Sequence, residues 1–211
     1  MARLWLLDFD GTLVDSEKAI KSCYLKVGKE LVPERSNFIK TMVIGPTLDE
    51  TSRMILTDEK IDLLDVFKNK FQKIYDEKLV LTTKKYTSVD STLKQLNDKS
   101  DDLCIVTNKR SNPTLKLINY YGWIDLFYWI ACIDEYPEAN NKSDLIKLKK
   151  INKKKYDAIY LVGDTLSDGI AANDNRISFI RANYGYGTNQ NWKKIKIYKT
   201  INQFNEILKI T

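Results

Sequence analysis

Two aspartates stand two positions apart at the end of a short apolar run. The run Leu4–Leu7 leads into Asp8 and Asp10, and Gly11-Thr12 follows. A run of this length predicts a buried strand, and residues i and i+2 of a strand point the same way. We therefore expect Asp8 and Asp10 to converge just past the strand's carboxyl end, where open α/β sheets bind ligands. Because two carboxylates repel each other, a divalent cation, a shared proton or both should offset their charge.

Polar residues also follow a second predicted strand and precede a later helix. Thr107 and Asn108 come directly after the apolar run 103–106, and their hydroxyl and amide can hydrogen-bond a phosphate oxygen. The same pair is also ordinary turn chemistry. Lys142 precedes a predicted helix, and a lysine near an aspartate nucleophile would screen charge and hold phosphate. Lys147 is the alternative candidate for this role.

Two more aspartates follow the strand predicted at residues 158–162. Asp164 and Asp168 lie in the segment Gly-Asp-Thr-Leu-Ser-Asp, which begins at residue 163. Carboxylates at a strand end suit Mg²⁺, which keeps several waters and takes few protein ligands. Asp168 can instead cap the helix that follows. We expect Asp164 to contact the cation directly and Asp168 to support the site from behind or through water.

The composition excludes several classes of catalytic site. The chain has 211 residues and no histidine, which excludes Ser-His and Cys-His nucleophiles and histidine metal sites. Acid/base work must fall to carboxylates, Lys, Tyr or Cys. The net charge of +6 favours anionic ligands. Cys23, Cys104 and Cys132 are widely spaced and match no metal or disulfide framework, so we expect buried free thiols in a reducing cytoplasm.

The sequence also limits which classes of binding partner are expected. Six lysines between residues 147 and 155 form a basic cluster, but without aromatic interleaving or a binding motif they favour a solvated helix face over nucleic-acid binding. No apolar run approaches the length of a membrane span, and residues 1–3 lead into the first strand without a signal-peptide pattern. We expect a cytoplasmic protein without membrane association; the oligomeric state is left open.

The chain divides into two regions that differ in the periodicity of their apolar residues. Residues 14–82 show helical periodicity with no strong strand signal, and are predicted to form a compact helical insertion. From residue 83 onward, helices alternate with strands, including a last strand predicted at 195–198 and a helix from about residue 202. Such alternation predicts an α/β fold, with a Rossmann-like three-layer core and a mostly parallel sheet. The core is expected to comprise residues 1–13 and 83–211.

These segments together resemble the four motifs of the haloacid dehalogenase superfamily of phosphohydrolases. The DxDGT stretch at residues 8–12 is similar to motif I, Thr107 to motif II, Lys142 to motif III, and the GDxxxD stretch at 163–168 to motif IV. The family's motif III lysine is commonly followed by proline, whereas Ser143 follows here. A helical insertion right after motif I is typical of the type-1 cap. The segments 171–173 and 185–187 are similar to the phosphoglycolate-phosphatase-like branch.

The resemblance implies a mechanism. Asp8 would attack the phosphorus to give an aspartyl-phosphate, and Asp10 would protonate the leaving alkoxide and then activate water. Mg²⁺ would be held by Asp8, the backbone carbonyl of Asp10 and Asp164, while Thr107, Asn108 and Lys142 would orient the phosphoryl group. The cap would exclude water and contact a small phosphorylated metabolite. The candidate cap residues are Lys40, Thr47 and Arg53.

Other functions share parts of this pattern. The presence of Asp10 disfavours dehalogenation, whereas a phosphosugar mutase has the same core motifs. A receiver-type signalling domain also surrounds a phosphorylatable Asp with acidic residues, Thr and Lys, but its phosphoacceptor ends a later strand and no cap follows. A catalytically idle phosphate-binding relative would be expected to lack core residues that are intact here. Among substrates, phosphoglycolate, nucleotide monophosphates, sugar phosphates and pyrophosphate remain open.

Overall fold

A six-stranded parallel sheet forms the centre of the protein. The structure is a computed structural model that describes residues 2–210. The strands lie in the order β5-β4-β1-β6-β7-β8, and every neighbouring pair is parallel. Their bounds are β1 Arg3–Leu7, β4 Asp102–Thr107, β5 Trp129–Cys132, β6 Ala158–Gly163, β7 Ser178–Ala182 and β8 Lys199–Ile201. The predicted α/β core is confirmed.

The sheet is covered on both faces, and its central strands β1, β4 and β6 are largely apolar and buried. On one face Trp5 and Leu7 pack in a cluster with α5 (Val89–Asp98) and α6 (Ser111–Tyr120). On the other, Leu4 and Leu6 pack with α7 (Lys142–Leu148) and α8 (Leu166–Asp174). Strands buried on both faces read as continuous apolar runs, which is why the run before Asp8 is so easily recognised.

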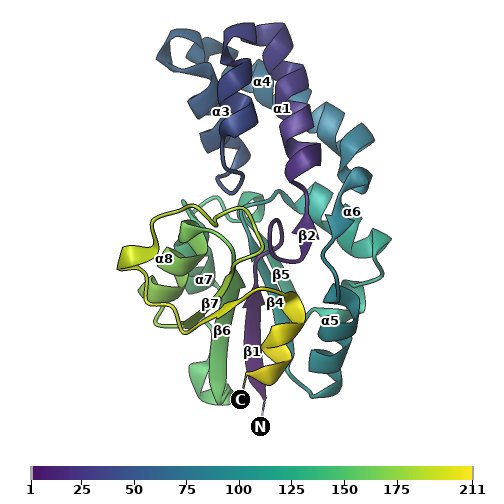
Figure 1. Cartoon of the computed structure of the whole chain (residues 1–211), viewed down its shortest axis with the longest axis vertical. Coiled ribbons are helices and arrows are strands. Elements are labelled where there is room, and N and C mark those ends of the chain that lie inside the picture. The colour runs from purple at the N-terminus through teal and green to yellow at the C-terminus, as the bar shows by residue number, and fades with distance from the viewer. Residues whose placement is uncertain (1, 211) are drawn as a thin grey trace.

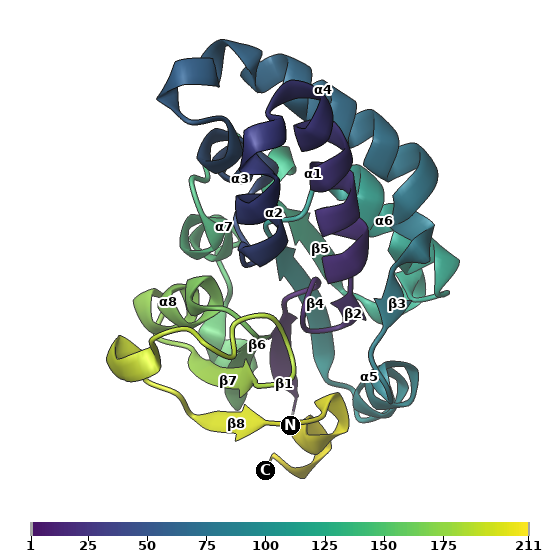
Figure 2. The same cartoon turned by 45° about the horizontal axis from the view of Figure 1, so that its top comes forward.

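The region between β2 (Val14–Asp15) and β3 (Lys84–Lys85) is helical and stands above the carboxyl ends of the central strands (Figures 1 and 2). β2 and β3 form a two-residue antiparallel pair. Between them lie α1 Glu17–Leu31, η1 Pro33–Arg35, α2 Ser36–Thr41, α3 Leu48–Leu56, η2 Asp58–Leu63, α4 Leu64–Ile74, a π-helix η3 Tyr75–Leu79 and η4 Val80–Thr82. We call residues 14–82 the helical segment.

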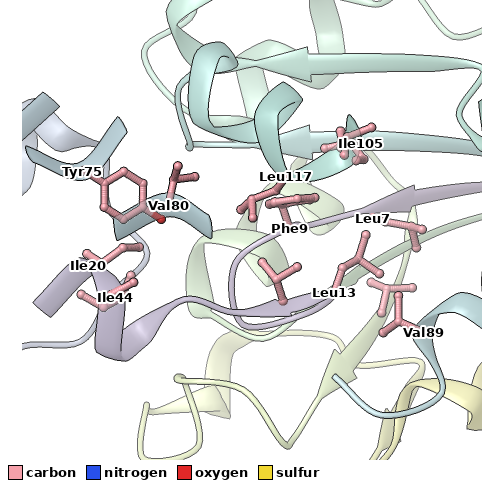
Figure 3. Close-up of a cluster of buried hydrophobic side chains, with 14 of the residues drawn as sticks. Leu7, Phe9, Leu13, Ile20, Ile44, Tyr75, Val80, Val89, Ile105 and Leu117 are labelled. Atoms are coloured by element: carbon pink, nitrogen blue, oxygen red, sulfur yellow. The ribbon is translucent and has the colours of Figure 1, made fainter. Parts of the chain in front are cut away.

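The helical segment and the sheet share one apolar cluster. Figure 3 shows Phe9 and Leu13 after β1 near Leu117 of α6, with Ile20 and Tyr75 of the helical segment farther along the same row. All five are buried. The path of the chain out of β1 is therefore fixed by packing on both sides.

The C-terminal elements differ from the sequence prediction. The last strand is β8 at residues 199–201, so the prediction at 195–198 is wrong; Ile195 and Ile197 pack against the α7–α8 side instead of pairing in the sheet. The final helix is a 3-10 helix, η9 (Phe204–Lys209), whose Phe204 and Ile207 are buried. The remaining short 3-10 helices are η5 Ile124–Leu126, η6 Ile133–Glu135, η7 Lys153–Lys155 and η8 Trp192–Lys194.

Within residues 2–210, none of the helices combines the length and apolar character needed to cross a bilayer.

Candidate active site

Three neighbouring strands place the predicted site residues at one edge of the sheet. Asp8 follows β1, Thr107 ends β4 and Asp164 follows β6, and β1 lies between the other two. The chain runs from β1 to β4 and β5 on one side, then crosses to β6 on the other side of β1. A crevice forms where connections leave a strand in opposite directions, and open α/β sheets bind ligands there.

Lys142 contacts the first of these carboxylates. Its ammonium donates a hydrogen bond to Asp8 Oδ1 at 2.7 Å and also pairs with Asp168. Lys142 is buried although it is the first residue of α7. The side chain of Asn141 caps this helix by accepting the amide of Asp144 at 3.0 Å, which fixes where the lysine leaves the backbone. Lys147, the alternative candidate, is exposed and pairs with Asp144 instead.

Asp164 lies in a cradle of backbone. The amide of Tyr186 donates to its Oδ2 at 2.6 Å, and the Thr12 hydroxyl lies 3.4 Å from its Oδ1. Gly11 has a φ of 82°, and a Cβ at Gly11 or at Gly185 would collide with the Asp164 carboxylate. Both positions therefore require glycine for close approach.

Asp168 supports the site from the start of α8. Its Oδ2 accepts the amide and the hydroxyl of Thr165 at 2.9 and 2.8 Å, and its Oδ1 accepts from Lys142. The carboxylate thus caps its helix and holds the lysine at the same time. The sequence left two roles open for Asp168, a helix cap and a residue that supports the site. This geometry is compatible with both.

The electrostatics of this cluster suit a divalent cation. Asp8, Asp164 and Asp168 are all buried, and each offers an oxygen within 4.8 Å of the others. Burial, followed by the charge of Asp168, raises the pKa of Asp8 to about 7. Burial, followed by the charge of Asp8, raises the pKa of Asp164 well above its ordinary value. Three carboxylates and one ammonium leave two negative charges, and oxygen donors are those that Mg²⁺ prefers.

Asp10 faces a different set of partners. Its side chain accepts a hydrogen bond from the Ser16 hydroxyl at 2.5 Å, and the Lys109 ammonium lies 3.1 Å from both of its oxygens. Lys109 also donates to the Tyr75 hydroxyl at 2.9 Å, so it joins the core to the helical segment. Its pKa is raised, although burial alone would lower it, because Asp10 and Tyr75 stabilise the charged form.

Lys109, Ser16 and Tyr75 were missed by the sequence reasoning. Lys109 is the residue after Asn108, so a cation within two positions of a strand end could have been singled out. Ser16 stands just before α1, where a serine usually caps the helix, but its hydroxyl bonds Asp10 and makes no bond to α1. Nothing in the local pattern around Tyr75 indicates that it reaches Lys109, since these residues are 34 positions apart.

Thr107 and Asn108 have separate roles in the structure. Thr107 accepts the amide of Lys109 at 3.1 Å, which leaves its own hydroxyl proton free to donate. The amide nitrogen of Asn108 instead donates to the carbonyl of Gly45 in the helical segment at 3.1 Å. Asn108 thereby fastens the loop before α3 over the site.

A cavity of about 70 Å³ lies between these residues and the helical segment. Asp8, Asp10, Thr107 and Lys142 line its floor. The expected cap residues do not line it. Lys40 is exposed, Arg53 is exposed and pairs with Asp49 at 2.6 Å, and Thr47 caps α3 in a reciprocal pair with Glu50. A role for these three residues in reading the substrate stays a prediction.

Two lysines of the basic cluster at residues 147–155 contact side chains of the β4–β5 side of the sheet. Lys155 pairs with Asp102 at 2.8 Å. The ammonium of Lys149 lies 4.7 Å from the centre of the Trp129 ring and donates to the Tyr136 hydroxyl. The fold thus brings aromatic rings to these lysines that are not interleaved with them in the sequence. Their contacts tie α7 and η7 to the β4–β5 side of the sheet.

Comparison with known proteins places this arrangement in a family. The family model described as haloacid dehalogenase-like hydrolase matches residues 5–182. A phosphoglycolate phosphatase from Aquifex aeolicus is 31% identical over 79% of this chain and 78% of its own length. Another from Psychrobacter arcticus is 24% identical over 98% of this chain and 94% of its own.

A solved structure shows the same architecture over the whole chain. The crystal structure of a predicted phosphoglycolate phosphatase from Haemophilus somnus superposes with a TM-score of 0.82 at 24% identity, and covers 99% of this chain and 97% of that one. The resemblance drawn from the four motifs is thus confirmed. From the match over residues 5–182 and the aspartates at its strand ends, the chain belongs to the haloacid dehalogenase-like hydrolases.

Proposed function

We propose that the protein is a Mg²⁺-dependent phosphatase that hydrolyses a small phosphomonoester through an aspartyl-phosphate on Asp8. The observation that carries this proposal is the Asp8 carboxylate held at 2.7 Å by buried Lys142 on the floor of a cavity. The names of the relatives support a phosphate ester as substrate. In this proposal the helical segment acts as a cap over the core.

Asp8 performs the first half of the reaction. Its carboxylate attacks the phosphorus, the P–O bond to the alcohol breaks, and the phosphoryl group is transferred to Asp8. Lys142 fixes the orientation of the nucleophile and lies where it can neutralise charge on the phosphoryl oxygens. The free proton of the Thr107 hydroxyl is a second donor to those oxygens. Asn108 helps less directly, because its amide nitrogen is already bonded to the cap.

Asp10 acts first as the general acid and then as the general base. It donates a proton to the departing alkoxide, then as a carboxylate it takes one from the water that attacks the aspartyl-phosphate. The phosphate leaves and Asp8 is regenerated. Ser16 and Lys109 hold Asp10 in place through both steps. The contact of Lys109 with Tyr75 means that this arrangement is complete only when the cap is docked.

Asp8, Asp164 and the backbone carbonyl of Asp10 would hold Mg²⁺, with Asp168 behind them. When bound, the ion neutralises the charge of the transferring phosphoryl group. The two uncompensated negative charges of the cluster and the raised pKa values of Asp8 and Asp164 support this fit.

The first prediction concerns stability and pH. Without a cation, the folded protein keeps the Asp8 proton up to about pH 7, whereas the unfolded chain releases it near its ordinary pKa of 3.8. The stability that this proton contributes is present below the lower value and is lost as pH rises through the higher one. Mg²⁺ binds the deprotonated site, so its addition should raise Tm more at about pH 8 than at about pH 5.5. Thermal unfolding with and without Mg²⁺ at both pH values measures this, and an increase of equal size at both would contradict it.

The second prediction concerns Lys109. Lys109→Met removes the ammonium that holds Asp10, so kcat/KM for ethyl phosphate should fall about ten- to hundredfold. The loss should be smaller for acetyl phosphate, because its acetate leaves without needing a proton from Asp10. The difference appears in kcat/KM, because this ratio reports only the steps up to the first irreversible one, the transfer of the phosphoryl group to Asp8. Lys109→Arg should restore part of the activity.

A matched control separates positioning from docking of the cap. Lys116 also reaches the cap, donating to the carbonyl of Asp76 at 2.7 Å, but it does not contact Asp10. Lys116→Met should leave the ratio between the two substrates unchanged. Equal losses on both substrates in Lys109→Met would show that Lys109 does not act through Asp10.

The proposed function is tested by release of inorganic phosphate from a panel of phosphometabolites with Mg²⁺. A phosphatase releases phosphate from its substrate in step with the alcohol. A phosphosugar mutase would instead convert a sugar phosphate to its isomer with little free phosphate. Absence of both reactions, and of label on Asp8 after incubation with acetyl phosphate, would overturn the proposal.

A further inference from the structure

We propose that the alcohol released by this phosphatase is small, uncharged and largely apolar, unlike glycolate with its carboxylate. The inference rests on the proposed function and names the substrate class of the same site. It is drawn from the wall of the cavity opposite Asp8, where the leaving group must lie.

The wall that the cap contributes is mostly apolar and aromatic. Its apolar and aromatic side chains are those of Ile20 and Tyr24 of α1, Ile44, Leu48 at the start of α3, Phe71 of α4 and Tyr75, of which Leu48 is half-buried and the other five are buried. Gly45, Pro46 and the buried Thr51 complete the wall, and the hydroxyl of Thr51 is neutral. The rings of Tyr24, Phe71 and Tyr75 pack in a row, with centroids 4.3 and 5.5 Å apart. The row is fixed by its own contacts and offers the substrate ring surfaces and neutral hydroxyls.

Each cation that lines the cavity already pairs with a carboxylate of the chain. Lys142 pairs with Asp8 and Asp168, and Lys109 pairs with Asp10. The third, Arg110, makes two bonds to Asp76 of the cap, at 3.0 and 2.6 Å. Asp76 in turn accepts from Asn112 at 3.2 Å, so the Arg110 pair belongs to the contact that docks the cap on the core.

A carboxylate on the leaving group would have no favourable place here. Burying a charge against an apolar wall is costly unless a partner neutralises it. To obtain Arg110, a substrate carboxylate would have to displace half-buried Asp76 and leave it with the weaker neutral donor Asn112, so the ion pair lost offsets the ion pair gained. A neutral apolar group instead gains free energy when it leaves water for this wall.

The volume limits the size of the leaving group. At about 10–15 Å³ for each water-sized probe, a cavity of about 70 Å³ has room for about five to seven such probes. The phosphoryl group takes up the part of that space beside Asp8 and Lys142. An alcohol of a few carbons therefore fits the site as it stands with the cap docked.

The test uses two substrates of the same shape. Isobutyl phosphate and phosphoglycolate have the same number of non-hydrogen atoms and branch at the same carbon, but only phosphoglycolate carries a second anionic group. We expect kcat/KM for isobutyl phosphate to exceed that for phosphoglycolate by at least about tenfold, the effect of a contact difference of about 1.4 kcal/mol. Equal or better hydrolysis of phosphoglycolate overturns the inference.

Acetyl phosphate separates the two possible failures. If it is hydrolysed but isobutyl phosphate is not preferred over phosphoglycolate, the phosphatase function stands and the assignment of the leaving group falls. If no phosphate compound is hydrolysed, the proposed function itself fails and the inference falls with it.

A charge introduced into the wall should weaken the preference for the uncharged substrate. Leu48→Lys places an ammonium at a half-buried position of the cavity, and should raise the ratio of kcat/KM for phosphoglycolate over isobutyl phosphate by about tenfold. Met54→Lys is the matched control, since Met54 lies on the same helix, is 50% exposed and is outside this cavity. An unchanged ratio in a folded Leu48→Lys protein contradicts the assigned wall. The comparison of wild-type substrates stands even if that variant fails to fold.

Discussion

The variant Asp8→Asn is expected to release phosphate at least ~10³-fold more slowly than the wild type, on the scale of removing an essential covalent nucleophile. The amide keeps the shape of the side chain, and its oxygen can still accept the hydrogen bond that Lys142 now gives to Oδ1. What is lost is the attacking carboxylate. Initial rates on the best substrate of the panel, measured with Mg²⁺, give the ratio.

A second carboxylate on the same side of the sheet serves as control for this variant. Asp144 lies in α7 and pairs with exposed Lys147, away from the cavity. Asp144→Asn should retain near wild-type turnover. If Asp8→Asn also turns over at the wild-type rate, the covalent mechanism is excluded. If it is inactive and melts far below the wild type, the loss reflects folding and label transfer to Asp8 in the wild type becomes the deciding measurement.

The variant Asp164→Asn is expected to lose activity by about a hundredfold or more, equivalent to roughly 3 kcal/mol of lost charge stabilisation. Asparagine keeps an oxygen for the Tyr186 amide, so the cradle around residue 164 is preserved. Removing its negative charge should weaken Mg²⁺ binding and raise the Mg²⁺ concentration needed for half-maximal activity. Activity as a function of Mg²⁺ concentration measures both effects.

Chelation tests the same site without a substitution. EDTA should inactivate the wild type, and added Mg²⁺ should restore it. Asp102→Asn is the matched control, because Asp102 begins β4 at the opposite end of the strand and pairs with Lys155. A wild-type rate that is indifferent to chelation would mean that the acidic cluster does not work through a metal.

The strand ends were predictable from sequence because each is a short apolar run followed at once by a polar residue. In a parallel sheet such ends share one edge, so Asp8, Thr107 and Asp164 could be placed together before their distances were known. The order of the strands across the sheet is not encoded in such local patterns. It is set by packing between residues far apart in the chain.

Contacts between the cap and the core were not predictable for the same reason. Lys109 reaches Tyr75 and Arg110 reaches Asp76 across 34 positions, through geometry that no local periodicity reports. The engagement of Arg53 outside the cavity has a local reason that could have been seen. Asp49 and Arg53 are four positions apart on α3, the spacing of an ion pair on the exposed face of a helix.

The central position of β1 affects how readily different parts of the protein open to solvent. The amide of Asp8 donates to the carbonyl of Val162 at 2.9 Å, and β1 is paired with β4 and β6 along its length. Exchange of this amide with deuterated solvent requires β1 to separate from its neighbours, so it should follow global unfolding. The helical segment shares the apolar cluster with the core and is also fastened by polar contacts such as Arg110 with Asp76. Its amides should exchange through openings that leave the sheet intact. We therefore expect the amide of Asp8 to be among the slowest to exchange, and the amides of residues 14–82 to exchange faster.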